Sequence, residues 1–226
     1  MPRRRHVIPG MPLHITQRGV NRCATFLAED DFAFYLWVLG GASAAAQCAV
    51  HAYVLMTNHV HLLISAKDPV GPARLMRAIG TRYVRYFNDR YRRTGTLWEG
   101  RFRSTLIDTH AYFFACSRYI ERNPERAGLT DDPASYLWSS FRCNARGEPD
   151  RIVTAHPLYT ALGPDADARC RTYRRLFALE PSPTVVTAVR TASRARRALP
   201  EADYEEAAAA VFGRAPDGTT GSRSGG

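Results

Sequence analysis

Residues 50–65 read VHAYVLMTNHVHLLIS and contain two strand-like apolar runs, 50–56 and 59–65, separated by the polar pair Thr57–Asn58. This pattern is typical of a β-hairpin, and asparagine tolerates the positive φ that tight hairpin turns require. Because side chains alternate along a strand, His59 and His61 should point to one face of the sheet, and their apolar neighbours to the other.

The flanking segments predict a sheet larger than one hairpin. Residues 13–18 alternate as a strand that ends at Gly19, and 97–107 form a further extended stretch with Arg101 and Arg103 on one side. With helices between these strands, the pattern predicts an α+β fold, in which helices pack on an antiparallel sheet.

Apolar residues at helical spacing predict three helices in the same region. The first follows Asp30–Asp31, and the second lies between Pro72 and Gly95, which closes it. The third, over 109–123, must end there because the next residue is a proline, which disfavours α geometry in the residue before it.

The composition narrows the class of partner. A net charge of +10 and a pI of about 9.8 indicate that the protein binds a polyanion, most simply nucleic acid. All but one of the 31 basic residues are arginine, which suits phosphates and base edges, although a GC-rich coding sequence would give the same excess. The five cysteines include no C-x-x-C pair, so we expect neither disulfides nor a zinc knuckle. We therefore expect a cytoplasmic, nucleoid-associated protein without a membrane segment.

His59 and His61 are the first candidates for chemistry, because two imidazoles side by side can clamp one cation. Such a pair also arises by chance, as two hydrogen-bonded histidines on a half-buried strand. A third ligand is therefore needed before the pair indicates a metal site.

The third predicted helix offers further candidates. Tyr112, Cys116, Tyr119 and Asn123 lie at i, i+4, i+7 and i+11, so they share one stripe of the helix. The alternative interpretation is that Tyr119 packs in the core and Asn123 only caps the helix end.

Four stretches, in this order, carry a resemblance to a known family: 58–64 (NHVHLLI), 95–104 (GTLWEGRFRS), 118–129 (RYIERNPERAGL) and 136–140 (YLWSS). The chain resembles the IS200-like single-tyrosine HUH transposases, and within them the REP-associated tyrosine transposases. The resemblance covers residues 12 to 142.

The resemblance implies a ferredoxin-like or RRM-like core in which the sheet displays the two histidines and a helix presents the nucleophile. By position, Tyr119 is the catalytic nucleophile, and His59, His61 and Asn123 are the metal ligands. This neutral ligand set suits Mg²⁺ or Mn²⁺, although imidazole also accepts zinc. The implied activity is a metal-dependent endonuclease and strand transferase that binds repeated palindromic hairpins of single-stranded DNA and cleaves and rejoins the strand through a 5′-phosphotyrosine.

The resemblance and the composition together predict four parts of the chain. They are a basic N-terminal arm over 1–11, a catalytic domain over 12–145, a helical extension over 146–212 and a disordered tail over 213–226. In the extension, 166–179 and 185–198 are the helix candidates, and the tail is rich in glycine, serine and threonine.

Arginines dominate the predicted DNA-binding surface. Between residues 71 and 126 there are twelve arginines against five acidic residues, around the catalytic motifs. The predicted DNA-binding residues are Arg3, Arg4, Arg5, Arg85, Arg92, Arg93, Arg101, Arg103, Arg118 and Arg122.

Two other functions are compatible with these residues. One is a DNA-binding regulator that keeps the fold without catalysis, and the other is a rolling-circle replication initiator or relaxase, which shares the H-x-H pair. The sequence leaves open which DNA site is the target and whether the protein moves a mobile element or serves a resident host function. It also leaves open whether the protein is a monomer or a homodimer that shares active sites.

Overall fold

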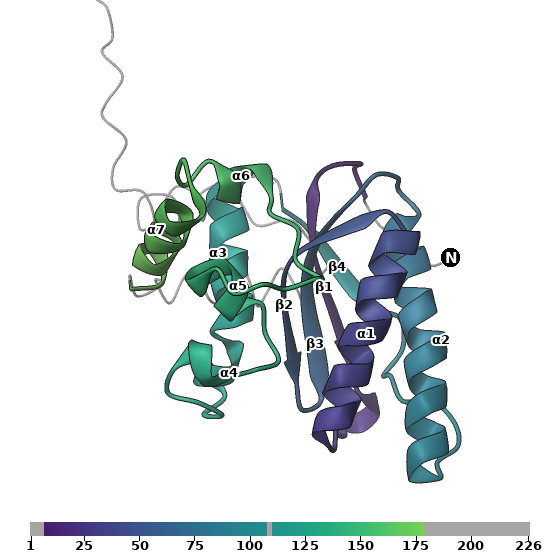
Figure 1. Cartoon of the computed structure of the whole chain (residues 1–226). Helices are drawn as coiled ribbons and strands as arrows, with labels where there is room; N and C mark the ends of the chain where they lie inside the picture. The colour runs from purple at the N-terminus through teal and green to yellow at the C-terminus, as the bar shows by residue number, and fades with distance from the viewer. Residues whose placement is uncertain (1–6, 108–109, 179–226) are drawn as a thin grey trace, which may run out of the picture.

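A computed structural model describes residues 7–107 and 110–178 and contains one four-stranded antiparallel sheet (Figure 1). Its strands lie in the order β2-β3-β1-β4, with bounds β1 Pro12–Arg18, β2 Cys48–Met56, β3 His59–Ala66 and β4 Arg103–Leu106. Helix α1 (Glu29–Ala45) joins β1 to β2, and α2 (Gly71–Tyr91) joins β3 to β4. This β-α-β-β-α-β order is the ferredoxin-like arrangement, so the predicted fold class is confirmed.

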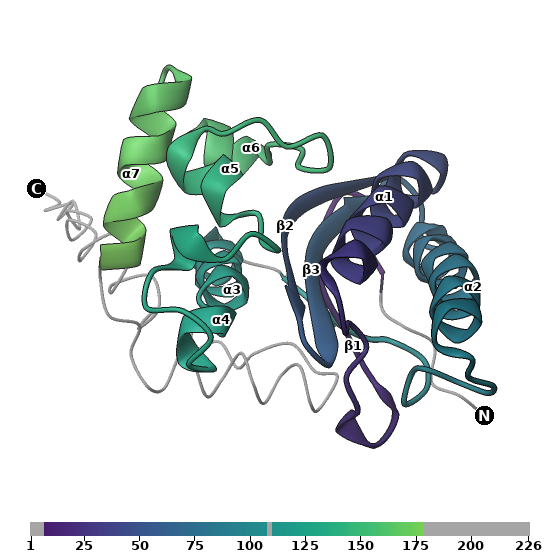
Figure 2. The ribbon, with the colours of Figure 1, turned by 60° about the horizontal axis from the view of Figure 1, so that its bottom comes forward.

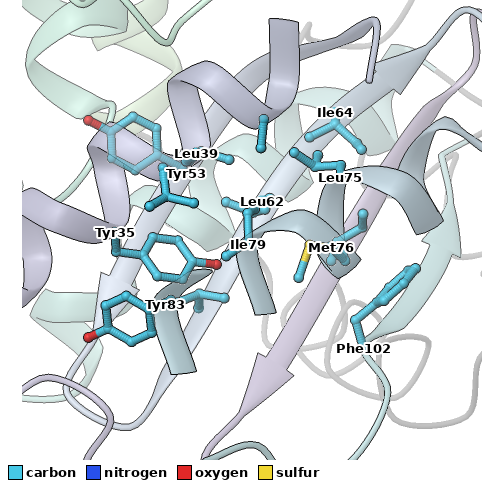
Figure 3. Packing of buried hydrophobic residues seen from close by; sticks show 14 of the residues in the cluster. Tyr35, Leu39, Tyr53, Leu62, Ile64, Leu75, Met76, Ile79, Tyr83 and Phe102 are labelled. Carbon is cyan, nitrogen blue, oxygen red and sulfur yellow. The ribbon is translucent and has the colours of Figure 1, made fainter. Parts of the chain in front are cut away.

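Helices α1 and α2 cover one face of the sheet and bury the main hydrophobic core (Figures 1 and 3). Val60, Leu62 and Ile64 of β3 point into this core, where they meet Leu39 of α1 and Ile79 of α2. The apolar side chains at alternate positions of β3 therefore pack under α1 and α2, and the histidines at the positions between them point to the opposite face of the sheet.

The opposite face carries helix α3 (His110–Glu121), which packs on β2 and β3 (Figure 2). A second core between them surrounds Leu63, Tyr112 and Ile120. Small elements follow α3: α4 (Asn123–Arg126), η2 (Pro133–Ser135), α5 (Phe141–Arg146), α6 (Pro157–Thr160) and α7 (Ala166–Ala178). Tyr173 and Leu176 of α7 belong to the same core. The first part of the predicted extension thus packs behind the helix that carries Tyr119.

The segment 136–140 runs along the outer edge of β2. The Tyr136 hydroxyl donates to the Leu55 carbonyl at 2.6 Å, and the Leu55 amide donates to the Trp138 carbonyl at 2.9 Å. The Ser140 amide donates to the Tyr53 carbonyl at 3.0 Å. The segment therefore satisfies backbone groups that an edge strand would otherwise expose.

The hairpin is confirmed, but its predicted turn geometry is wrong. Among the described residues, the non-glycine positions with positive φ are Asn21, Arg22, Gln47 and Arg92, so Asn58 is not one of them. Asn58 contributes through its side chain instead, as the candidate site shows.

Three predicted elements also differ in their bounds. Helix α2 ends at Tyr91, where Arg92 takes the left-handed conformation at φ 49°, so Gly95 is not its stop. Of the extended stretch predicted over 97–107, only β4 forms a continuous ladder with β1, whereas Trp98 forms an isolated bridge with Gly19. Helix α3 ends at Glu121, and Asn123 begins the separate turn α4.

The arm with Arg3, Arg4 and Arg5, the helix predicted over 185–198 and the tail predicted over 213–226 lie outside the described residues. All five cysteines lie within the described residues, and all five are free thiols. In the described part of the chain, no helix combines the length and the hydropathy needed to span a bilayer.

Candidate active site

Strand pairing brings the two predicted histidines to the face that α1 and α2 leave uncovered. His59 lies opposite Arg18 of β1, and His61 lies opposite Thr16. Since directly paired residues share a face, Arg18 and Thr16 stand beside the histidines, and Val60 points into the opposite core. The prediction that His59 and His61 share a face is confirmed.

The side chain of Asn58 fixes the ring of His59. Its Nδ2 donates to the Arg22 carbonyl at 3.0 Å, so its Oδ1 faces the Nδ1 of His59 at 2.7 Å. Arg22 belongs to the 3₁₀ turn η1 (Val20–Arg22), which starts after Gly19. A Cβ on Gly19 would lie 2.3 Å from the Cys23 carbonyl oxygen, so this tight loop requires glycine.

A third imidazole, which the sequence did not single out, belongs to the same cluster. His14 of β1 is 1% exposed, and its Nε2 lies 2.8 Å from the Nδ1 of His61. The two rings stack, with centroids 5.0 Å apart and an interplanar angle of 22°. The alternation in 13–18 already places His14 on the other face of the strand from Leu13 and Ile15, but the sequence does not reveal that β1 pairs with β3.

Tyr119 of α3 stands edge-on to this cluster. Its ring centroid lies 5.7 Å from that of His61 and 6.0 Å from that of His14. Tyr119 is half-buried, whereas Tyr112, two turns earlier on the same helix, is 0% exposed. The structure therefore brings Tyr119, and not Tyr112, to the histidines.

Arg126 of α4 holds the ring of Tyr119 from another side. Its guanidinium carbon lies 4.2 Å from the ring centroid, which is a cation–π geometry, and its Nη2 donates to the Tyr119 carbonyl. Arg126 was not among the predicted site residues, although it follows Tyr119 by seven residues, two helical turns.

Asn123 lies at the start of α4, two residues beyond the end of α3 at Glu121. Its Nδ2 is buried and has no hydrogen-bond partner within the described residues. No hydrogen bond in this part of the chain joins Asn123 to His59 or His61. The structure thus brings together the two histidines and Tyr119, and leaves Asn123 nearby in sequence with an unused amide.

Burial keeps the imidazoles neutral. Desolvation lowers the pKa of His14 to about 3 and, with a contribution from the Arg18 charge, that of His59 to about 4. The pKa of His61 falls well below its usual value, first through desolvation and then through the neighbouring imidazoles, Arg126 and Arg18. All three rings are therefore in the neutral form that metal coordination requires.

The hydrogen bonds of the ligand candidates fit a cation. His59 and His61 each engage Nδ1, with Asn58 and His14 respectively, so Nε2 remains as the ligand atom of each ring. Across residues 7–107 and 110–178, no three histidine, cysteine, aspartate or glutamate side chains are grouped to hold a metal ion. The third ligand predicted from the sequence, the amide of Asn123, is not one of these residue types and stays a prediction.

Five of the predicted DNA-binding arginines lie on or near the surface. Arg103 of β4 is exposed and pairs with Thr16, which places it on the histidine face, and Arg101 precedes it in an exposed loop. The Arg85 side chain on α2 is 84% exposed. At the end of α2, Arg92 is exposed and Arg93 is half-buried, with its guanidinium 5.4 Å from the ring centroid of Phe87.

Two further arginines of this prediction are buried or paired within the protein. Arg118 is 3% exposed, and a buried guanidinium cannot meet a DNA backbone without rearrangement. Arg122 forms two hydrogen bonds with the carboxylate of Glu125, at 2.7 and 2.8 Å. Helical spacing alone could not distinguish Arg118 and Arg122 from the arginines on the surface.

Fold and site together define a ferredoxin-like α+β protein with a half-buried tyrosine beside paired strand histidines. The family described as "Transposase IS200 like" matches residues 10–123, half of the chain, and the chain belongs to this family. A solved structure of a REP-associated tyrosine transposase bound to a REP hairpin is similar in fold, with a TM-score of 0.55 and 19% sequence identity. That match covers 69% of this chain and 92% of the other. No curated protein matches the chain significantly.

Proposed function

We propose that this transposase-like protein cuts and rejoins single-stranded DNA next to repeated palindromic hairpins, with Tyr119 as the nucleophile. The observation that carries the proposal is the contact of the Tyr119 ring with His61, at 5.7 Å between centroids, on a sheet face not covered by α1 and α2. Family membership supports a transposase-like DNA function. The DNA in the similar structure is a REP hairpin, which supports a hairpin as substrate.

The proposed reaction is a transesterification. The Tyr119 oxygen attacks a DNA phosphorus, loses its proton, and forms a 5′-phosphotyrosine, while the bond from phosphorus to the 3′ oxygen breaks. The 3′ oxygen takes up a proton and leaves as a hydroxyl. Attack by another 3′-hydroxyl on the phosphotyrosine reverses these steps and joins new ends, so the reaction needs no ATP.

We propose His59, His61 and Asn123 as the ligands of Mg²⁺ or Mn²⁺. A phenol is a weak nucleophile at neutral pH, and a bound divalent cation would polarise the phosphate and offset charge in the transition state. The neutral imidazoles, with Nδ1 engaged and Nε2 available, support this assignment. The amide of Asn123 would bind the cation through its Oδ1, while its buried, unpartnered Nδ2 is a donor from which a phosphate oxygen could accept a hydrogen bond.

The proposed DNA surface combines the basic arm, Arg3, Arg4 and Arg5, with exposed arginines of the folded domain. Arg103 and Arg18 support it most directly, because strand pairing gives them the same face as the histidines. Arg101, Arg85, Arg92 and Arg93 extend the positive charge away from the site, whereas Arg118 and Arg122 are left out because of their burial and ion pairing.

The test separates metal binding from DNA binding. In the double variant His59→Ala/His61→Ala, Mg²⁺- or Mn²⁺-dependent cleavage of a hairpin oligonucleotide should be lost. Hairpin affinity should stay within about tenfold, roughly 1.4 kcal/mol, since the histidines hold the cation and not the DNA. The oligonucleotides should come from the DNA that flanks the gene.

Three outcomes distinguish the alternatives. Undiminished cleavage by the double variant would end the metal assignment. Tight hairpin binding by the wild-type protein without cleavage, with either ion, would favour a regulator that keeps only the fold. Cleavage of a plasmid origin in preference to the flanking hairpins would favour a replication initiator or relaxase.

A further inference from the structure

The proposed function requires the Nε2 of His61 to carry a lone pair for the cation, and His14 is the side chain placed to control this. His14 lies in the middle of β1, between Leu63 and Thr105 on the two neighbouring strands. Its Nε2 lies 2.8 Å from the Nδ1 of His61, and the pair is buried. The two imidazoles therefore share one hydrogen bond in an interior where neither is charged.

A hydrogen bond between two neutral imidazoles has two tautomeric arrangements. If the Nδ1 of His61 donates, its Nε2 carries a lone pair and can bind a cation. If instead the Nε2 of His14 donates, the proton of His61 must sit on Nε2, and that atom cannot be a ligand. The hydrogen-bond partner of the His61 Nδ1 thus decides whether the His61 Nε2 can bind a cation.

The neighbouring histidine shows the same arrangement without this ambiguity. The Nδ2 of Asn58 donates to the Arg22 carbonyl at 3.0 Å, so the Oδ1 that faces His59 can only accept. The Nδ1 of His59 must then carry the proton, and its Nε2 the lone pair. Both strand histidines have a dedicated partner at Nδ1, from two different parts of the chain.

We infer that His14 is a positioning residue, which accepts the Nδ1 proton of His61 and so holds the Nε2 of His61 unprotonated as a ligand atom. The ring stacking, at 5.0 Å between centroids, also fixes the plane of the His61 ring. His14 lies edge-on to Tyr119 at 6.0 Å, so one side chain contacts both the proposed ligand and the proposed nucleophile. This inference rests on the proposed metal site, but its tautomer claim can be tested without a metal.

The first measurement is the tautomer of His61 in the metal-free protein, by long-range ¹H–¹⁵N correlation spectra of the imidazole rings. Wild-type His61 should be protonated on Nδ1. In His14→Phe, which keeps a flat ring but removes the acceptor, that tautomer should be lost or mixed with the other. In His14→Gln, whose Oε1 can accept, it should be retained. His61 found protonated on Nε2 in the wild-type protein would overturn the inference, even if His14→Phe does not fold.

The second measurement is the affinity for Mn²⁺, by calorimetry in a Tyr119→Phe background with an uncleaved hairpin. His14→Phe should weaken Mn²⁺ binding by about 10- to 100-fold, the usual effect of losing a partner of a ligand histidine, and His14→Gln should restore most of it. His51→Phe is the matched control. It also removes a buried, hydrogen-bonded imidazole, but its partners are Ser65 and the Thr154 carbonyl.

The outcomes separate this inference from the proposed function. Equal Mn²⁺ affinity in His14→Phe and wild type, with His61 still protonated on Nδ1, would refute the role of His14. Equal losses in His14→Phe and His51→Phe would show a general packing defect and refute it as well. If the wild-type protein binds no Mn²⁺, the metal assignment fails, and the tautomer spectra alone decide whether His14 sets the proton on His61.

Discussion

Glu121 should make the stability of the protein fall as the pH rises through the weakly acidic range. This carboxyl ends the helix that carries Tyr119 and is 0% exposed. Ser140 and Asn144 donate to its Oε1, and the Tyr173 hydroxyl donates to its Oε2 at 2.8 Å. Burial nevertheless dominates over these hydrogen bonds and raises the pKa of Glu121 from 4.5 to about 7.

The sign follows from which state holds the proton. Between pH 4.5 and 7 the folded protein keeps the Glu121 proton and the unfolded chain has released it, so the stability that this proton contributes is complete below pH 4.5. It is lost progressively as the pH rises to 7. At 1.36 kcal/mol per pH unit, the loss amounts to about 3 kcal/mol of unfolding free energy.

Glu121→Gln isolates this effect. Glutamine imitates the protonated carboxyl, since its Oε1 can accept from Ser140 and Asn144 while its amide donates to the Tyr173 hydroxyl. Urea unfolding of both proteins, followed by circular dichroism from pH 4.5 to 8, should show the variant gaining about 3 kcal/mol relative to wild type up to pH 7, and then a plateau. The buried histidines are common to both proteins, so their titration cancels in the difference. A difference that is independent of pH, or that shrinks as the pH rises, would refute the reasoning.

Two further predictions concern arginines. Arg126→Gln should slow formation of the covalent adduct by about two- to fivefold in single-turnover gels, because a partly exposed cation–π contact is worth about 0.5–1 kcal/mol; an unchanged rate would deny Arg126 a part in placing the ring. Arg101→Gln/Arg103→Gln should reduce the slope of log affinity against log salt by up to about 1.4–1.8, at roughly 0.7–0.9 per phosphate contact. Filter binding from low to high salt measures this slope, and a slope equal to that of the wild-type protein would remove these two arginines from the DNA surface.

The short-range part of the fold could be predicted from the sequence. The hairpin and the shared face of His59 and His61 depend on alternation within one strand, and the structure confirms both. The end of α3 could be placed only approximately. Pro124 signals a stop, but α3 already ends at Glu121, and the separate turn α4 begins two residues later, at Asn123.

The long-range part of the site could not be predicted. His14 lies 47 residues before His61, and only the pairing of β1 with β3 brings them together. Helical spacing likewise could not show that Arg118 is buried, because α3 is covered by segments that follow it in the chain. His14 was missed because its neighbours are set by topology and not by spacing.

The central claim is that Tyr119 is the nucleophile, and the competing side chain is Tyr112. The two share α3 but lie roughly 10 Å apart along its axis, at 1.5 Å of rise per residue. Tyr119 contacts His61 and is half-buried, whereas Tyr112 is 0% exposed in the second core. Tyr119→Phe and Tyr112→Phe make the same chemical change on the same helix, so each is the control for the other.

The most direct measurement is the covalent protein–DNA adduct on a denaturing gel, after incubation with a hairpin oligonucleotide and Mg²⁺ or Mn²⁺. Tyr119→Phe should abolish the adduct while hairpin binding and fold are preserved, and Tyr112→Phe should leave it. Mass spectrometry of the trapped wild-type adduct should find the DNA on the peptide that contains Tyr119. An adduct that persists in Tyr119→Phe, or that maps to another residue, would contradict the account.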